Sequence, residues 1–316
     1  MSAFCFVAPS WPMDVWASAM REVMPQLDVR VWPDTVGNPQ DITYAAAWLA
    51  PPDVLKNFSN LKVIFSLGAG VDAILSDPTL PSQVPIVRVN DPDLTNRMSE
   101  YIVLHVLMHH RQQRRLDANQ KARLWDGFAT HAAKDITVGI MGLGVLGQDS
   151  AMKLKAMGFQ VVGWSRSRKS LPGVKSFAGS AQFEEFLQCT DILVSLLPAT
   201  PQTEGIINSK LISKLSRRGP LGAPILINAG RGRQQNENDI LAALNSGALH
   251  AATLDVFGKE PLPKESPLWG NPNLTITPHV AADSDPKTIC GYIQKQISAF
   301  EEGGPLQNLV DRQSGY

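Results

Sequence analysis

Three polar side chains follow apolar stretches in the second half of the chain, and together they could reduce a carbonyl group. Arg231 follows "PILINAG", Glu260 follows "AATLDVFGK" and His279 follows "LTITP". Histidine titrates nearest to neutral pH and suits a proton donor, and a neighbouring carboxylate would orient it and favour its charged form. Arginine can bind a substrate carboxylate and polarise the adjacent carbonyl. Each residue alone is better explained by a surface or packing role, so the inference depends on the three together.

A glycine-rich turn indicates which cofactor would supply the hydride. Gly142, Gly144 and Gly147 form a G-x-G-x-x-G motif after the apolar run "DITVGIM" and before a predicted helix. Such glycines permit a tight turn, close approach of the backbone to a pyrophosphate, and close packing of helix on strand. The helix start, with Val145 and Leu146, offers N–H groups to phosphates. A plain glycine turn is the alternative, but the strand–turn–helix context favours a dinucleotide site.

The basic stretch "SRSRK" lies where the next strand, "FQVVGW", ends. NAD-binding sites place an acidic residue there to hold the ribose 2′-hydroxyl. Here Ser165 and Arg166 occupy that place, followed by Arg168 and Lys169. A carboxylate would repel a 2′-phosphate, whereas arginine can pair with it. We therefore predict a 2′-phosphate site with Arg166 as its main cation, and NADPH as the cofactor; a solvated basic loop is the alternative.

Short apolar runs alternate with helical stretches along the chain, which favours βαβ units and parallel sheets. The runs separate into one group before Asp91 and another after Lys134. Between them, apolar residues at helical spacing predict one long helix starting near Thr95 or Asn96, either of which could cap it. A last helix, "DPKTICGYIQKQISAFEEGG", ends at paired glycines. We expect an α/β protein with two doubly wound parallel-sheet domains, and periodicity alone does not decide whether the last helix returns to the first of them.

Composition limits the classes of protein to consider. The 316 residues carry 29 basic and 29 acidic side chains, so the net charge is zero and gives no reason to expect nucleic acid or anionic membrane as a partner. Three scattered cysteines favour a reduced, cytoplasmic setting. The N-terminus does not resemble a signal peptide, and no stretch resembles a membrane span. His105 and His109 are four residues apart, but no further ligand pattern accompanies them, so we expect a packed helix and no metal.

The motifs in this order are similar to those of the D-isomer-specific 2-hydroxyacid dehydrogenase family. They are "LGAGVD", "GIMGLGVLG", "WSRSRKSLPGV", "LLPATPQTEGIIN", "NAGRGR", "LDVFGKEPLPKESPLW" and "ITPHVAA", and they span nearly the whole chain. The resemblance implies a flavodoxin-like substrate domain (1–95, 283–316), a Rossmann-like NADP-binding domain (96–282) and a homodimer. It also implies that Arg231 binds and polarises the substrate, that His279 donates the proton, and that Glu260 supports His279.

The same resemblance assigns further contacts. The backbone N–H groups of Ala69 and Gly70 would hold the substrate carboxylate, which agrees with the anion-binding properties of such turns. Trp48 would lie near the substrate, although a core position explains it equally well. The remaining cofactor contacts implied by the resemblance are Pro198, Thr203, Ala229 and Asp255, the last toward the nicotinamide amide.

One segment departs from the family pattern. In "RGRQQNEND", Arg233, Gln234, Gln235 and Asn236 stand where related sequences usually carry apolar residues. The sequence as a whole predicts an NADPH-dependent reductase of small 2-ketoacids such as glyoxylate or hydroxypyruvate. Two alternatives stay open: a reductase for a bulkier 2-ketoacid, and a regulatory protein of the same fold that senses the dinucleotide without turning it over.

Overall fold

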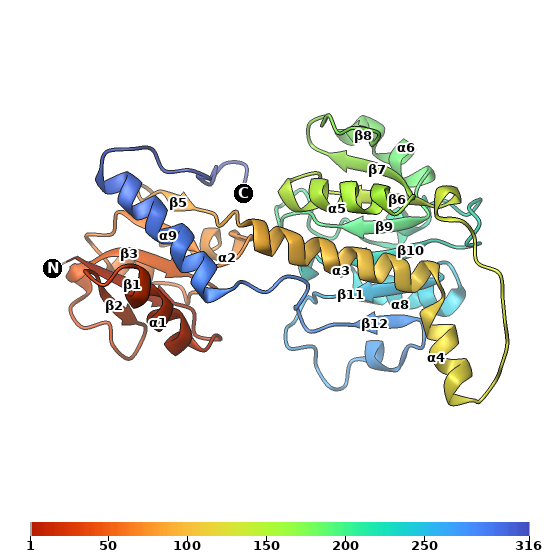
Figure 1. The fold of residues 1–316 in the computed structure, drawn as a ribbon, viewed down its shortest axis with the longest axis horizontal. Helices are drawn as coiled ribbons and strands as arrows, with labels where there is room; N and C mark the ends of the chain where they lie inside the picture. The colour runs from red at the N-terminus through yellow and green to blue at the C-terminus, as the bar shows by residue number, and fades with distance from the viewer. Residues whose placement is uncertain (1, 316) are drawn as a thin grey trace. The chain divides into compact units, whose positions relative to one another are not determined.

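The computed structural model describes residues 2–315, which form two compact units. Unit 1 contains the described residues up to Leu94 and those from Ser284 onward, and unit 2 is Thr95–Asp283. The C-terminal helix thus belongs to the same unit as the N-terminal strands (Figure 1). Within the described residues, no helix is long and apolar enough to cross a membrane.

Unit 1 is built on a five-stranded parallel sheet in the order β2-β1-β3-β4-β5, which is the flavodoxin-like order. Apolar side chains cover both faces of the sheet and form two cores. In one of them, α9 packs against α1 through Ile289, Cys290 and Ile293. The strands are β1 Ala3–Val7, β2 Asp28–Val31, β3 Ile42–Ala47, β4 Val63–Ser66 and β5 Ile86–Val87. The helices are α1 Met13–Val23, α2 Asp72–Leu75 and α9 Pro286–Glu301, with short turns η1 Pro39–Asp41 and η2 Leu55–Asn57.

Unit 2 is built on a seven-stranded parallel sheet in the order β12-β11-β10-β9-β6-β7-β8. The chain starts in the middle at β6, moves outward to β8, and returns to β9 on the other side of β6. This reversal is the topological switch point where open α/β sheets bind ligands beyond their carboxyl ends. The strands are β6 Thr137–Met141, β7 Gln160–Ser165, β8 Lys175–Ala178, β9 Ile192–Ser195, β10 Ile225–Asn228, β11 Ala251–Leu254 and β12 Leu274–Ile276.

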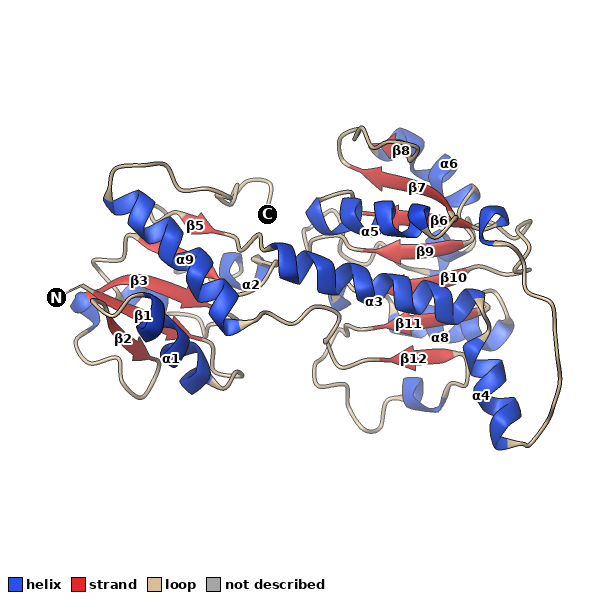
Figure 2. Cartoon of the chain, viewed as in Figure 1, coloured by secondary structure: helices blue, strands red, loops and turns tan. Residues whose placement is uncertain are grey.

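Helices lie on both faces of the unit 2 sheet (Figures 1 and 2). Side chains of α3 and α5 share one apolar core with the strands, and those of α6, α7 and α8 share the other. The α-helices are α3 Pro92–His110, α4 Gln113–Lys121, α5 Val145–Ala156, α6 Phe183–Gln188, α7 Ser209–Ile212 and α8 Glu237–Ser246. The short turns are η3 Ala133–Asp135, η4 Ser180–Gln182, η5 Gly232–Gln234 and η6 Pro267–Gly270.

The long helix between the two groups of strands differs from its prediction at both ends. It begins at Pro92, not near Thr95 or Asn96, because Asp91 caps it with a carboxylate that accepts the Leu94 N–H at 2.9 Å. It also ends at His110, so the single long helix that the sequence predicted is two helices. Gln112 adopts a left-handed conformation (φ 54°), which ends α3 and lets α4 start in a new direction.

The α/β class with two parallel sheets is confirmed, but two strands have no counterpart among the apolar runs. These are β2, "DVRV", and β8, "KSFA", and each lies at the edge of its sheet. An edge strand contacts one neighbour only and stays partly exposed, so it carries a weaker apolar signal.

Candidate active site

The three motif glycines have different surroundings. Gly142 follows β6 with a φ of 102°, which a side-chain-bearing residue rarely adopts. A Cβ on Gly147 would lie 1.9 Å from the Gly142 carbonyl oxygen, so only glycine permits this contact between helix and turn. A Cβ on Gly144 would meet no protein atom within 4 Å. Among the described residues, no side chain caps the start of α5. The turn therefore leaves open space and unused N–H groups at a helix N-terminus, which fits a pyrophosphate.

The basic loop after β7 is held by hydrogen bonds at three points. The Ser165 hydroxyl donates to the Ser167 carbonyl at 2.7 Å. Arg168 donates through Nη2 to the Gln182 Oε1 at 3.0 Å, and the Lys169 N–H donates to the Ser176 hydroxyl at 3.0 Å. Ser165 is buried, so its hydroxyl shapes the loop, whereas Arg166 and Arg168 are exposed at its surface.

Two further strand ends carry the other predicted cofactor residues. After β9, Thr203 folds back on its own loop: its hydroxyl donates to the Pro198 carbonyl at 2.7 Å and accepts the Thr200 N–H at 2.9 Å. After β10, Ala229 is buried, and its N–H donates to the Ser195 carbonyl at 3.2 Å. These loops follow β9, which is adjacent to β6, and β10, which is the next strand along, so both lie at the same carboxyl ends of the strands as the glycine turn.

The structure brings His279 and Glu260 together. The His279 Nδ1 lies 2.7 Å from the Glu260 Oε2, and the other carboxylate oxygen, Oε1, accepts the Phe257 N–H at 2.8 Å. Partial burial works to raise the pKa of Glu260, but the hydrogen bonds from His279 and Phe257 outweigh it, and the charge of Arg231 adds to their effect. The pKa of Glu260 is therefore lowered from its ordinary value. An ionised carboxylate has only acceptor positions, so Nδ1 of His279 is the donor in its contact with Glu260.

Asp255 holds the loop that carries His279. It is buried at the end of β11, and its two oxygens accept the N–H groups of Val280 and Ala281 at 2.9 and 3.0 Å and the Thr277 hydroxyl at 2.6 Å. His279 itself has a φ of 56°, and its N–H donates to the Asp255 carbonyl at 2.8 Å. The bonds around Asp255 thus stabilise a backbone conformation that is unusual for histidine. The sequence motif alone indicated a contact of Asp255 with the nicotinamide, which stays a prediction.

Arg231 follows β10, between the loops after β9 and β11. Its Nη1 donates to the Gly230 carbonyl at 2.9 Å, which bends the side chain back over its own loop. The strands β10, β11 and β12 are adjacent and parallel, so the segments that follow them leave the sheet on the same side, beyond the carboxyl ends of the strands. Arg231, Glu260 and His279 therefore lie on this side of the sheet. Arg231 is near enough to lower the pKa of Glu260 by its charge.

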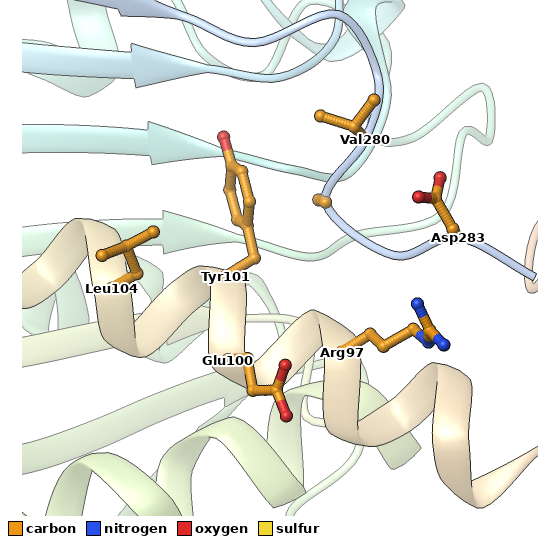
Figure 3. A pocket seen from close by; sticks show the side chains of 7 residues that line it. Arg97, Glu100, Tyr101, Leu104, Val280 and Asp283 are labelled. Atoms are coloured by element: carbon orange, nitrogen blue, oxygen red, sulfur yellow. The ribbon is translucent and has the colours of Figure 1, made fainter.

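An open pocket of about 400 Å³ lies beside the segment after His279. Figure 3 shows Tyr101 and Leu104 on α3 on one side of this pocket, and Val280 on the other. The Tyr101 hydroxyl lies 2.7 Å from the Thr277 hydroxyl, which connects α3 with the loop that precedes His279.

The predicted substrate residues of unit 1 lie after β3 and β4. The Ser66 hydroxyl is buried within hydrogen-bond distance of the Gly68 and Gly70 carbonyls, at 2.9 and 2.8 Å, and so draws both inward. In a trans peptide the N–H points opposite to the carbonyl, so the Ala69 N–H faces away from Ser66, as an anion donor would. Trp48 packs on Gly68, where a Cβ would lie 2.4 Å from its ring, and stacks with Trp11 at 5.4 Å. The Trp48 ring thus packs directly against the turn that contains Gly68, Ala69 and Gly70.

The histidine pair of α3 is packed in the protein. His105 Nδ1 lies 2.9 Å from the Tyr101 carbonyl, and His109 Nε2 lies 2.8 Å from the Thr253 hydroxyl. Burial lowers the pKa of His109 to about 3. Across residues 2–315, no group of three or more His, Cys, Asp or Glu side chains could hold a metal ion.

Sequence reasoning missed several polar residues that surround the predicted ones. Ser66, Gln182, Gln234 and Gln235 all bond to segments that carry predicted site residues. The two adjacent glutamines after Arg231 were visible as unusual polar residues, but their partners are distant in sequence. The others gave no local signal.

Comparison with known proteins places this geometry among dehydrogenases. Residues 103–281 match the family described as "D-isomer specific 2-hydroxyacid dehydrogenase, NAD binding domain". The chain is 40% identical to glyoxylate/hydroxypyruvate reductase A of Yersinia enterocolitica, over 98% of this chain and 99% of that protein.

Solved structures show the same likeness. The NADPH-dependent glyoxylate/hydroxypyruvate reductase of Sinorhizobium meliloti, in complex with NADP and sulfate, matches with a TM-score of 0.95 and 47% identity, and 100% of both chains is covered. A probable 2-hydroxyacid dehydrogenase of Rhizobium etli, in complex with NADP, matches with a TM-score of 0.93 and 43% identity, again over 100% of both chains.

Proposed function

The chain belongs to the D-isomer specific 2-hydroxyacid dehydrogenase family, and from this premise we propose that it reduces small 2-ketoacids to 2-hydroxyacids with NADPH. Glyoxylate and hydroxypyruvate are the proposed substrates, because the named relatives are reductases of these two compounds. The observation that carries the proposal is the 2.7 Å contact between His279 and an ionised Glu260, at the same sheet edge as the open glycine turn.

In the proposed reaction, Arg231 binds the ketoacid through its carboxylate and polarises the carbonyl oxygen. Donors that match developing negative charge lower the barrier most when they are already in place. From the family resemblance we also propose that the backbone N–H groups at Ala69 and Gly70 bind a substrate carboxylate, with Trp48 near the substrate. The Ser66 contacts, which turn the Ala69 N–H away from the interior, support this assignment.

His279 supplies the proton to the carbonyl oxygen through Nε2, since Nδ1 is engaged by Glu260. Bound reduced nicotinamide supplies the hydride to the carbonyl carbon. One ketoacid, one NADPH and one proton thus give one hydroxyacid and one NADP. The His279 side chain is 37% exposed, so it can regain its proton from solvent after each turnover.

The cofactor site proposed here consists of the glycine turn and the basic loop. The open space at Gly144 and the N–H groups of the first turn of α5, including Val145 and Leu146, suit the pyrophosphate. Arg166 would bind the 2′-phosphate, with Arg168 and Lys169 adding charge. The loops at Pro198–Thr203 and Ala229, together with Asp255, complete the proposed contacts.

The roles proposed for the two units follow from these sites. Unit 1 would bind the substrate carboxylate and unit 2 would bind NADPH, and unit 2 contains the matched NAD-binding segment. A cytoplasmic location is also proposed, and the three free cysteines support it.

A homodimer is proposed as well. Apolar side chains in α4 and in the segment directly after it are exposed, among them Leu116, Leu124 and a fully exposed Trp125. A second copy of the chain would cover them. Sedimentation should give twice the mass of one chain, and Trp125→Ser should lower the dimer's stability; a wild-type protein that sediments as one chain would exclude the dimer.

The test of function is the initial rate of NADPH oxidation with glyoxylate and with hydroxypyruvate, each repeated with NADH. Turnover that favours NADPH is expected. Turnover only with larger 2-ketoacids would replace the proposed substrates. Tight NADPH binding without turnover of any ketoacid would support the sensor alternative and reject the enzyme.

A further inference from the structure

Two buried glutamines lie three and four residues after the predicted substrate arginine, Arg231. Gln234 is 0% exposed and Gln235 is 8% exposed. A buried primary amide is costly unless its donors and acceptors are paired, so the partners of these amides show what the burial achieves.

Gln234 uses its full hydrogen-bonding capacity on two loops. Its Nε2 donates to the Leu197 and Pro198 carbonyls at 2.7 and 3.0 Å, both in the loop after β9. Its Oε1 accepts the Ser195 hydroxyl at 3.2 Å and the Arg231 N–H at 3.3 Å. An amide side chain has two donors and two acceptor positions, and all four are occupied.

Gln235 connects the Arg231 loop with the segment after β11. Its Nε2 donates to the Val256 carbonyl at 2.8 Å, directly before the turn that contains Glu260. Its Oε1 accepts the Asn228 amide at 2.8 Å. Asn228 in turn donates to the Arg231 carbonyl at 3.3 Å and accepts the Gly230 N–H at 3.0 Å.

The Arg231 loop is therefore tied on both sides. One glutamine connects it with the Leu197–Pro198 segment, and the other connects it with the segment that leads to Glu260. Gly230 fits against the first amide, since a Cβ on it would lie 2.7 Å from the Gln234 Oε1. The Gly230 carbonyl also accepts the hydrogen bond from the Arg231 guanidinium that turns this side chain back over its loop.

We propose that Gln234 and Gln235 are positioning residues that fix the backbone of Arg231 between the two neighbouring loops. Both side chains are buried and bonded within the protein, so we assign neither of them a contact with the substrate. They act by keeping residues 229–231 in one conformation, so that the guanidinium does not need to be ordered when the ketoacid binds. The inference rests on the proposed function for its kinetic consequence, but the ordering of the loop can be measured without any substrate.

Gln234→Met is the direct test, since it keeps the length of the side chain and removes all four hydrogen bonds. The matched control is Gln296→Met in unit 1, where a buried glutamine (7% exposed) accepts the Gln307 N–H at 2.9 Å far from these loops in sequence. Amide hydrogen exchange of peptides covering 229–233 is measured in the cofactor-free protein, and kcat/KM for glyoxylate is measured with saturating NADPH.

We expect Gln234→Met to speed exchange at 229–233 at least about tenfold and to lower kcat/KM for glyoxylate roughly 10- to 100-fold, because small misplacements of a binding group cost that much. The dissociation constant of NADPH should rise by a smaller factor than kcat/KM falls, because only the proposed contacts at Pro198 and Ala229 border Gln234, and the proposed phosphate contacts lie at other loops. Gln296→Met should leave both the exchange at 229–233 and kcat/KM near wild type.

Unchanged exchange at 229–233 would overturn the proposal, and so would faster exchange with unchanged kcat/KM, which would reduce the glutamines to structural residues. If Gln234→Met does not fold, Gln235→Met cuts the other connection and is held to the same criteria. A wild-type protein with no activity on any ketoacid would refute the proposed function instead, while the exchange data alone would still decide whether the glutamines order this loop.

Discussion

The contact between Glu260 and His279 predicts how much catalytic efficiency (kcat/KM) should be lost when Glu260 is replaced by a neutral amide. Glu260→Gln keeps the shape of the side chain and an oxygen for the Phe257 N–H, but removes the charge that stabilises a protonated imidazole. A hydrogen bond to a charged group contributes about 1.5–3 kcal/mol. The two side chains are 37% and 36% exposed, so solvent reduces this to about 1–2 kcal/mol. That corresponds to a loss of roughly 5- to 30-fold in kcat/KM.

The assay is NADPH oxidation with glyoxylate across a pH series, together with the thermal unfolding temperature. Glu237→Gln is the matched control, because Glu237 also accepts a backbone N–H of the same turn, from Gly258 at 2.8 Å, but makes no contact with the imidazole of His279. We expect the control to stay within about twofold of wild type, since surface substitutions away from special contacts have small effects. Both variants should unfold close to the wild-type temperature.

A double-mutant cycle gives the refuting result. If Glu260 acts through the imidazole, Glu260→Gln should cost little once His279→Asn is present, because the two changes remove one shared interaction. Equal losses in both backgrounds would show that the carboxylate acts on something other than His279. The cycle also has a pH signature: the lowered pKa of Glu260 keeps it ionised until the pH falls below its ordinary range, so its contribution is lost only on the acidic side.

Three further predictions concern other parts of the structure. Gly144→Ala should raise the KM for NADPH roughly tenfold without lowering the unfolding temperature, whereas Gly147→Ala should lower that temperature, because its Cβ would meet a carbonyl at 1.9 Å; equal effects on binding and stability would contradict this division. Arg166→Ala should weaken NADPH much more than NADH in titrations of both, and equal weakening would exclude the 2′-phosphate contact. The unfolding free energy in urea should fall by up to about 1.4 kcal/mol per pH unit below pH ~6.5, because the unfolded chain protonates His109 there and the folded chain does so only near pH 3. His109→Gln should flatten this slope, and an unchanged slope would rule out His109 as its source.

Much of the fold was predictable because parallel sheets buried on both faces have strongly apolar strands. The family and the α/β class are confirmed. The strands β2 and β8 were missed because edge strands are partly polar. The long helix was predicted as one piece because residues 111–121 contain no glycine or proline that would end a helix, whereas in the structure a single left-handed residue, Gln112, turns the chain.

The candidate site also has features that could be predicted from the sequence and features that could not. A strand end is recognisable locally, so the positions of Arg231, Glu260 and His279 at neighbouring strand ends followed from the sequence. Their mutual geometry did not, because it depends on hydrogen bonds between distant segments. The left-handed backbone of His279 is one such case, since it is stabilised by Asp255, 24 residues earlier in the chain.

The two halves of the site differ in how they are built, and this explains why one is easier to recognise than the other. The cofactor turn depends on positions that carry no side chain. At Gly144 the place of a side chain is open space, and at Gly147 it is filled by the Gly142 carbonyl. Glycine at fixed spacing is a strong local signal. The arginine and histidine loops work through buried polar contacts, and many side chains could make them; Gln234 and Gln235 do so here. A single substitution at a glycine of the turn should therefore be enough to impair the protein. At the buried contacts, by contrast, a paired replacement that restores the same hydrogen bonds should be tolerated.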